Sequence, residues 1–261
     1  MENFEYTIEY SLHFITENLK NKGKIFVGFS GGKDSIVTAD LMKRSGIPFQ
    51  LYYSVTGIDP PEVVKFIRKN YPECIFLRPK YTFWHYLLTK NPPANFHRWC
   101  CRELKKVPSA KIPLRHRVMG IRAEEGSRRS KYDLITYIHT LDVFHYSPIL
   151  YWKELDVWDY IEDRNLLYPD LYDQGLSRLG CVICPFHSTG KGAGHNFYRQ
   201  RWPKFFERFE KYCLIWFEKR KNQGRKMFFD TPDEFIAEWY KGNVQWYARK
   251  TDQMCFDDFG V

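Results

Sequence analysis

The sequence contains no apolar run long enough to cross a lipid bilayer, no internal repeat and no low-complexity tract. These absences argue against a helical membrane protein, a repeat array and a disordered chain. Residues 1–5 also lack the basic start and the apolar stretch of a secretory signal, so we expect a cytoplasmic protein with no membrane partner. What remains is an ordinary globular composition, with 44% hydrophobic and 27% charged residues among 261.

Acidic residues are in deficit, and the formal net charge is +9. Such a charge fits an anionic partner, either the phosphates of a nucleotide or a nucleic acid, and composition does not choose between them. Cysteines number seven, and in a reducing compartment clustered cysteines indicate metal binding or catalysis rather than disulfides. Four cysteines form two pairs and three stand alone: Cys100 with Cys101, Cys181 with Cys184, and then Cys74, Cys213 and Cys255.

Hydrophobic periodicity and turn residues predict an alternation of helices and strands. Helices are predicted over residues 5–20, 35–42, 61–68 and 153–162, and strands over residues 24–29, 47–53, 75–77 and 117–121. This order is typical of an α/β protein with a mostly parallel, twisted sheet between layers of helices. The pattern becomes helical, basic and aromatic further on, so we predict one domain over residues 1–190 and a helical C-terminal subdomain over residues 191–261.

A glycine-rich loop lies between the first predicted strand and the helix that follows, with the sequence Ser30-Gly31-Gly32-Lys33-Asp34-Ser35. Its two glycines allow a tight turn that brings backbone N–H groups up to an anion, and the start of the helix adds its positive end. Lys33 supplies a full charge, and the hydroxyls of Ser30 and Ser35 can donate to phosphate oxygens. The loop is not a Walker A motif, because Val27 stands in place of the first glycine of that motif.

This hexapeptide resembles the PP-loop of the N-type ATP pyrophosphatases and, more narrowly, of the PAPS reductase family. The resemblance implies an adenine nucleotide alpha hydrolase-like fold in which the loop holds the terminal phosphates of ATP, bridged by Mg²⁺, or a related sulfonucleotide. Gly120-Ile121-Arg122 is similar to a later Gly-x-Arg element of the family. That similarity implies that Arg122 and Arg129 face phosphate or sulfate, with a plain surface charge as the other interpretation of either arginine.

Thr56-Gly57 stands where the family often has Asp-Thr-Gly. The resemblance therefore implies a set of nucleotide-binding residues, of which Lys33, Asp34 and Arg122 would be catalytic. The full set is Ser30, Gly31, Gly32, Lys33, Asp34, Ser35, Thr56, Gly57, Gly120, Arg122 and Arg129. A third stretch that is similar to the family, residues 147–161, carries its Pro and Trp spacing, and we interpret it as packing.

The two cysteine pairs are separated by 79 residues (181 − 101 − 1). Four thiolates can bind zinc or a [4Fe–4S] cluster, and adjacent cysteines are unusual for structural zinc. The arrangement resembles the Cys-Cys…Cys-x-x-Cys pattern of APS reductases and of DndC-type DNA sulfur-modification proteins. That resemblance implies a [4Fe–4S] cluster on Cys100, Cys101, Cys181 and Cys184, with zinc and free thiols as the other interpretations.

Within the family, APS and PAPS reductases carry a nucleophilic cysteine in a Glu-Cys-Gly-Leu-His-like tail. Cys255 is near the corresponding place but lacks that motif, so our first hypothesis is an ATP pyrophosphatase similar to DndC and SspD. It would adenylylate an acceptor for sulfur incorporation, in DNA phosphorothioate modification, with DNA, a cysteine desulfurase and other sulfur-modification proteins as partners. The second hypothesis is an APS or PAPS reductase with Cys255 as nucleophile, and the third is a nucleotide- and cluster-binding adaptor without turnover.

Basic and aromatic residues are interleaved in the predicted C-terminal helices, from Arg199 onward. Aromatic rings among cations suit a nucleic acid. An amphipathic helix with core aromatics and a solvated basic face gives the same pattern, and the sequence leaves both interpretations open.

Overall fold

A six-stranded sheet forms the centre of the part of the chain that the structure describes. The structure is a computed structural model and describes residues 2–95, 97–127, 129–188, 194–225, 227–242 and 244. The strands are β1 (Ile25–Gly28), β2 (Phe49–Ser54), β3 (Ile75–Leu77), β4 (His116–Met119), β5 (Ile135–Ile138) and β6 (Val143–Tyr146). Their order is β3-β2-β1-β4-β6-β5, and neighbours run parallel except β5 and β6 at one edge. The predicted α/β fold with a mostly parallel sheet is confirmed.

Helices precede, connect and follow the strands, and several begin at a capping residue. They are α1 (Glu2–Leu19), α2 (Lys33–Arg44), α3 (Pro61–Asn70), α4 (Phe83–Thr89), α5 (Trp99–Cys101), α6 (Val107–Ala110), α7 (Glu154–Asp163), α8 (Gly194–Arg201), α9 (Pro203–Asn222) and α10 (Pro232–Lys241). α3 begins at Pro61, whose missing N–H costs little in a first turn. The hydroxyls of Thr82 and Thr231 each accept a hydrogen bond from the backbone N–H three residues later, which starts α4 and α10.

The strand order brings the glycine-rich loop and the Gly120 segment together. From β1 the chain moves outward to β2 and β3, and it then returns to place β4 on the other side of β1. The carboxyl ends of β1 and β4 therefore flank a topological switch point, where ligands of open α/β sheets bind. The parallel register is continuous across this point, since Val27 of β1 lies beside Leu51 of β2 and Val118 of β4.

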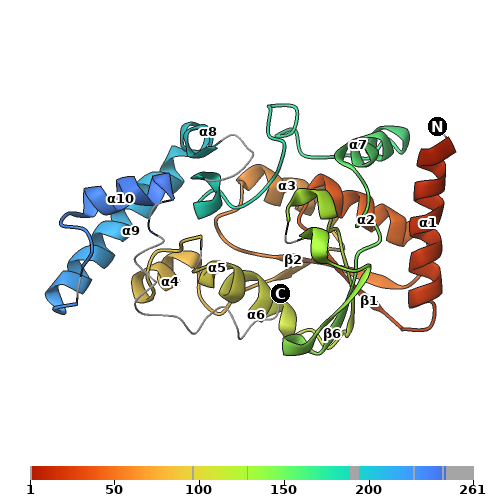
Figure 1. Cartoon of the computed structure of the whole chain (residues 1–261), viewed down its shortest axis with the longest axis horizontal. Helices are drawn as coiled ribbons and strands as arrows, with labels where there is room; N and C mark the ends of the chain where they lie inside the picture. Colours follow the sequence, from red (N-terminus) through yellow and green to blue (C-terminus); the bar gives the residue numbers. More distant parts are fainter. Residues whose placement is uncertain are drawn as a thin grey trace.

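Both faces of the sheet are covered, which explains why its central strands are apolar runs. Ile25 and Val27 point into the larger core, which they share with α1, α2, α3 and α7; α2 and α7 lie side by side there (Figure 1). Phe26 points to the opposite face, where its ring stacks on Tyr52 with the centroids 4.4 Å apart. Burying each such side chain contributes about 1.5–3 kcal/mol relative to exposure, so the helices are held firmly against the sheet.

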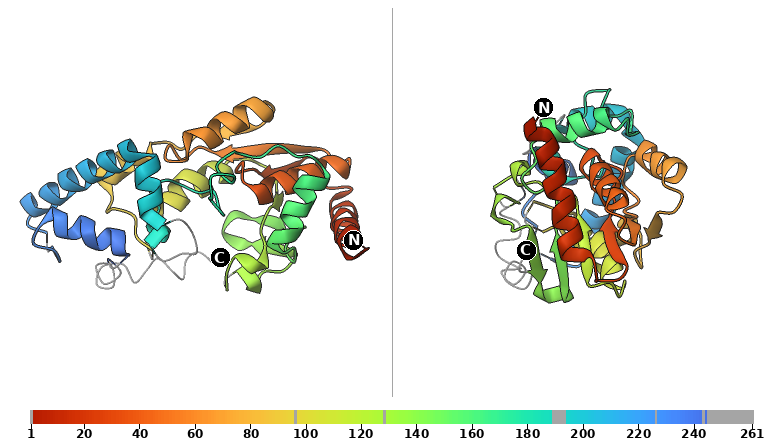
Figure 2. Two further views of the ribbon diagram at one scale, coloured as in Figure 1. Left: turned by 90° about the horizontal axis from the view of Figure 1, so that it is seen from above. Right: turned by 90° about the vertical axis from the view of Figure 1, so that its right-hand side faces the viewer.

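The C-terminal helices α8, α9 and α10 form one end of the elongated molecule, and α1 lies at the other end (Figure 1, Figure 2). α9 packs on α4, where the guanidinium of Arg208 lies 4.4 Å from the ring centroid of Trp84. The indole N–H of Trp239 in α10 donates to the carbonyl of Pro93 at 2.6 Å. Four aromatic residues of α9 are buried in this packing: Phe206, Phe209, Trp216 and Phe217. The amphipathic interpretation of the C-terminal pattern therefore applies to these rings.

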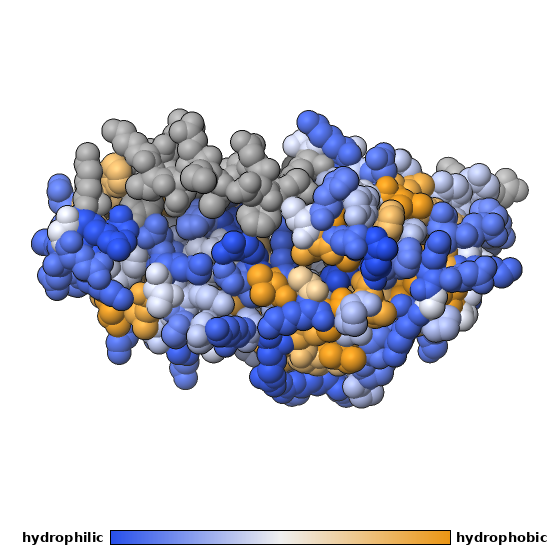
Figure 3. Space-filling view, turned by 90° about the horizontal axis from the view of Figure 1, so that it is seen from below, coloured by the Kyte–Doolittle hydropathy of each residue, from blue (hydrophilic) through white to orange (hydrophobic). Residues whose placement is uncertain are grey.

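The face drawn in Figure 3 is mostly hydrophilic, and its apolar side chains gather mainly over the part that contains the sheet. Among the large apolar side chains that remain exposed are Tyr6, Tyr151 and Leu155. Within the described ranges, no helix is both long and apolar enough to span a membrane.

Candidate functional site

The glycine-rich loop follows β1 and turns directly into α2, with Gly32 just before the first helical turn. Gly31 has a φ of +72°, and a Cβ there would lie 2.9 Å from Cγ1 of Ile67 in α3. Only glycine meets both conditions, because other residues rarely adopt this conformation and have no room. The Ser35 hydroxyl donates to the Gly32 carbonyl at 2.8 Å and accepts from the Ser30 N–H at 3.2 Å. The loop is thus a preorganised turn at the positive end of a helix.

Lys33 lies at the centre of this loop, and its side chain is only 4% exposed. Its backbone N–H donates to the Tyr172 hydroxyl at 2.9 Å, and its ammonium donates to the Ser177 carbonyl at 2.8 Å. The ammonium also pairs with Glu154 Oε1 at 3.2 Å. Burial raises the pKa of Tyr172, so its hydroxyl stays protonated at neutral pH. The backbone N–H and the ammonium of Lys33, which we predict to bind phosphate, are therefore paired with three oxygen atoms of the chain itself.

Sequence reasoning missed Tyr172, Ser177 and Glu154. Tyr172 and Ser177 lie 139 and 144 residues after Lys33, in a turn that carries no motif. Glu154 is the first residue of α7, in a segment that we interpret as packing. No local signal identifies these three residues, because their proximity to the loop depends on how α7 and the following turn pack on α2.

The segment after β4 closes the other side of the loop. A Cβ on Gly120 would lie 2.8 Å from the carbonyl oxygen of Asp34, so glycine is required for this approach. Arg122 is 3% exposed, and its Nε donates to Asp34 Oδ1 at 2.5 Å. Burial alone would lower the pKa of Arg122, but the negative charge of Asp34 raises it. The structure places Arg122 against the loop, whereas Arg129 pairs with Glu125.

The Thr56-Gly57 turn after β2 leads to an acidic centre at Asp59. Gly57 has a φ of +74°, which favours glycine. Asp59 Oδ2 accepts hydrogen bonds from the Thr56 hydroxyl at 2.6 Å and from the Tyr53 hydroxyl at 2.5 Å. Its other oxygen lies 3.5 Å from Sγ of Cys181, the donor. Burial and the negative charge of Asp59 raise the pKa of Tyr53, so this centre ties β2 to the second cysteine pair.

The clustered cysteines come together from α5 and from residues 181–184. The second segment is docked by the N–H of Val182, which donates to the Ile58 carbonyl at 2.7 Å. A hydrogen bond from the Cys100 thiol raises its own pKa and lowers that of Cys101 to about 6, and the charges of the second pair add to the rise at Cys100. All four thiols are therefore electrostatic neighbours. We call this group the four-cysteine site; its members are Cys100, Cys101, Cys181 and Cys184.

An all-sulfur donor set fits a [4Fe–4S] cluster or zinc. In the described part of the chain, no group of three thiol, imidazole or carboxylate side chains is already arranged as a metal site, so ligation requires the thiols to close around the group. Lys105 lies in the helical turn after α5, and the negative charge of Cys181 foremost raises its pKa. Burial raises the pKa of Cys181 and Cys184, and the positive charge of Lys105 opposes that rise. Four sulfur donors beside a cation therefore fit such a group.

The cysteines outside this site differ in their surroundings. Cys74 and Cys213 are buried, and burial raises the pKa of both thiols, that of Cys74 to about 12. Neither is a nucleophile at neutral pH, because the thiolate is the reactive form. Cys255, the nucleophile of the second hypothesis, lies outside the described residues.

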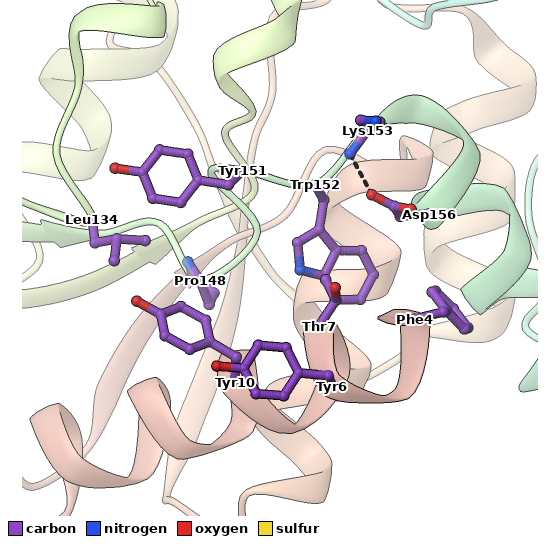
Figure 4. A pocket seen from close by; sticks show the side chains of 10 residues that line it. All are labelled: Phe4, Tyr6, Thr7, Tyr10, Leu134, Pro148, Tyr151, Trp152, Lys153 and Asp156. Carbon is purple, nitrogen blue, oxygen red and sulfur yellow. Dashed lines mark hydrogen bonds between the residues drawn. The ribbon is translucent and has the colours of Figure 1, made fainter. Parts of the chain in front are cut away.

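A cavity of about 480 Å³ lies between α1 and the segment before α7 (Figure 4). It is lined by Tyr6 and Tyr10 of α1 and by Tyr151 and Trp152, among others. The indole N–H of Trp152 donates to the Ser11 hydroxyl at 2.9 Å, which holds α1 against this segment. The described residues that line the cavity include none of the predicted nucleotide-binding residues, so the cavity is separate from the phosphate loop.

Comparison with known sequences identifies relatives of the region that carries the site. A model of the phosphoadenosine phosphosulfate reductase domain matches residues 24–187. An uncharacterized protein of Methanocaldococcus jannaschii is 30% identical over 184 residues, which cover 65% of this chain and 43% of that protein. The adenosine 5′-phosphosulfate reductase of Geobacillus kaustophilus is 29% identical over 185 residues, which cover 64% of this chain and 74% of that enzyme. The chain thus spans less than half the length of the M. jannaschii relative.

Comparison with solved structures agrees on the fold. A phosphoadenylyl-sulfate reductase from Candida auris, in a phosphate complex, superposes with a TM-score of 0.53 at 15% identity and covers 69% of this chain and 95% of its own. An FMN adenylyltransferase from Candida glabrata, with FMN and the ATP analogue AMPCPP, superposes with a TM-score of 0.52 at 16% identity and covers 69% of this chain and 63% of its own. At such low identity these structures are similar in fold alone.

Proposed function

The chain belongs to the phosphoadenosine phosphosulfate reductase domain family, and we propose that it is a PP-loop ATP pyrophosphatase that activates an acceptor for sulfur incorporation. The observation that carries this proposal is the position of Lys33. Its backbone N–H and its ammonium converge at the start of α2, at the switch point between β1 and β4. A buried cation at the N-terminal end of a helix is suited to a polyanion such as the terminal phosphates of ATP.

The proposed chemistry is adenylyl transfer. An acceptor oxygen attacks the α-phosphorus of ATP, the bond from that phosphorus to its bridging oxygen breaks, and pyrophosphate leaves. Negative charge grows on the departing pyrophosphate, and Lys33 with the loop N–H groups would stabilise it. Asp34 would help hold a Mg²⁺ ion, which when bound would offset phosphate charge, and its contact with Arg122 at 2.5 Å would keep the carboxylate oriented.

We propose a DNA phosphate as the acceptor. A cysteine desulfurase partner would supply sulfur as a persulfide, from which a second thiol would release hydrosulfide while the two remaining sulfur atoms form a disulfide. The hydrosulfide would attack the adenylylated DNA phosphorus and displace AMP, which leaves a phosphorothioate. The net charge of +9 supports an anionic partner, and DNA phosphates are one such partner. The four-cysteine site would hold a [4Fe–4S] cluster, which when bound supplies a rigid, redox-capable joint between α5 and residues 181–184. Zinc is the alternative occupant, and anaerobic purification followed by an iron and zinc assay distinguishes the two.

The proposed reaction is tested by pyrophosphate release. The protein, purified without oxygen, is incubated with ATP and Mg²⁺, with and without double-stranded DNA, and pyrophosphate is measured. We expect release that depends on the acceptor and that Lys33→Ala abolishes, whereas Lys43→Ala, an exposed lysine of the same helix, retains it. If wild-type protein releases no pyrophosphate under either condition, this function is wrong.

The likeness to adenosine 5′-phosphosulfate reductase supports a second candidate, reduction of a sulfonucleotide. In that reaction a cysteine thiolate attacks the sulfur, AMP leaves, and a thiol then releases sulfite. Cys74 and Cys213 are unsuited to this role because they are buried, so Cys255 is the candidate nucleophile. Sulfite formed from APS or PAPS with a thiol, and lost in Cys255→Ser but not in Cys213→Ser, would establish this function.

A further inference from the structure

We infer that Glu154, Tyr172 and Ser177 form an internal competitor for the phosphate site, which we call the loop stopper. This inference rests on the proposed function and goes further, because it assigns roles to residues outside the PP-loop motif. Tyr172 supplies the first contact, since its hydroxyl oxygen accepts the Lys33 N–H at 2.9 Å. The same oxygen lies only 3.2 Å from where a Cβ on Gly32 would stand, so it occupies the concave side of the loop.

The other two contacts engage the lysine charge. Glu154 Oε1 lies 3.2 Å from Lys33 Nζ, and the Ser177 carbonyl accepts from the same nitrogen at 2.8 Å. One carboxylate, one phenol and one carbonyl therefore take the positions in which phosphate oxygens would accept from this residue. A buried ammonium without such partners would be strongly disfavoured, so the stopper also keeps Lys33 paired when no nucleotide is bound.

The stopper is built to be displaced. Glu154 begins α7, and its side chain is 47% exposed, so its carboxylate can turn into water once a phosphate pairs with Lys33 in its place. Tyr172 and Ser177 belong to an irregular turn, with Gly175 between them at a φ of +93°. The turn is anchored by Leu171 and Leu176, which are both buried, while Ser177 is exposed. Rotation of the Tyr172 side chain and a shift of the backbone at Ser177 would remove both oxygens from the loop and leave these two apolar anchors in place.

An intramolecular competitor has a definite thermodynamic signature. Each ligand that needs the loop must first displace the same contacts, so its apparent dissociation constant is raised by one common factor. Ligands that bind by few contacts, such as orthophosphate, then fall below useful affinity, whereas ATP retains binding through its adenosine. Removing a stopper group should therefore tighten the binding of pyrophosphate and of a non-hydrolysable ATP analogue by the same ratio.

Calorimetric titration with inorganic pyrophosphate tests this inference. We expect Tyr172→Phe to lower the dissociation constant about threefold to tenfold, as the loss of one competing hydrogen bond predicts. Glu154→Gln should lower it about twofold to fivefold, since the ion pair is partly exposed. Tyr168→Phe is the matched control, because that hydroxyl bonds to Asp173 at 3.0 Å on the same segment and should leave affinity unchanged.

The possible outcomes separate this inference from the proposed function. If pyrophosphate binds wild type and Tyr172→Phe equally, or binds Tyr172→Phe more weakly, the stopper is wrong while the phosphate site stands. If pyrophosphate binds neither the wild type nor any variant, the proposed function fails as well. Unequal ratios for pyrophosphate and the ATP analogue would also contradict a common competitor.

Fluorescence gives a second readout that reports movement directly. The Tyr172 ring meets the Trp158 ring edge to face, with centroids 5.1 Å apart. Displacement of Tyr172 should change the emission of Trp158 when pyrophosphate binds. We expect that change in the wild type and its loss in Trp158→Phe. If pyrophosphate binds but changes the emission of neither the wild type nor Trp158→Phe, Tyr172 stays in place and the inference is overturned.

Discussion

The phosphate loop consists of six consecutive residues, whereas the four-cysteine site joins two segments separated by 79 residues (181 − 101 − 1). In the loop, the backbone itself is the proposed binding surface, and Gly31 and Gly120 permit its close contacts with α3 and with the segment after β4. In the four-cysteine site, side chains would do the binding, and their positions depend on the docking of Val182 against Ile58. A local site of the first kind is fixed by its own fold, while a site of the second kind depends on long-range packing and on what occupies it.

This difference predicts that damage to one site leaves the other intact. The largest effect is expected at the four-cysteine site, where Cys184→Ser removes one of four sulfur donors and should cost most of the bound iron. Pyrophosphate affinity should not change, because the loop does not contact this residue. Iron content and the visible spectrum of anaerobically purified protein measure the first effect, and calorimetry measures the second.

Cys213→Ser is the control for this experiment, since Cys213 is buried away from the other thiols in α9. Its iron content should equal that of the wild type. A Cys184→Ser protein that retains full iron would show that the four thiols do not form one metal site.

Gly31→Ala should produce the next largest effect, and it should leave the iron content unchanged. A left-handed backbone and a Cβ 2.9 Å from Ile67 together should lower the free energy of unfolding by about 2–4 kcal/mol. Gly46→Ala separates the two causes, because Gly46 also has a positive φ, of +71°, but nothing within 4 Å of a Cβ. Denaturant unfolding should place Gly46→Ala between the wild type and Gly31→Ala, and equal losses would contradict the steric contact with α3.

Lys33→Ala should affect binding more than stability. Losing a charged donor to phosphate should weaken pyrophosphate binding roughly 10-fold to 100-fold, as expected for hydrogen bonds that involve a charge. Iron content should remain that of the wild type, which sharpens the contrast with Cys184→Ser. Unchanged affinity in calorimetry would mean that the loop does not hold phosphates through this residue.

The sequence predicts the local structure around the glycine-rich loop well, because that structure is local. Strand, glycine turn and helix are consecutive, so periodicity and residue type are enough to predict them. Tyr172 and Glu154 are beyond such reasoning, because only the packing of α7 and the following turn brings them to Lys33. The sequence also does not predict the edge strand β5. Ile135 and Tyr137 are exposed there, because an edge strand need not have the continuous apolar run of a buried strand.

The smallest expected effect concerns the link between the four-cysteine site and the sheet. Asp59 accepts from the Tyr53 and Thr56 hydroxyls and lies 3.5 Å from Sγ of Cys181. Asp59→Asn keeps the shape but removes the charge, so the free energy of unfolding should fall by about 1 kcal/mol. A double-mutant cycle with Tyr53→Phe isolates their bond, because residues in contact have non-additive effects. Strict additivity would mean that the Tyr53–Asp59 bond does not stabilise this link, which would then rest on the other contacts of the segment, such as the Val182–Ile58 backbone hydrogen bond.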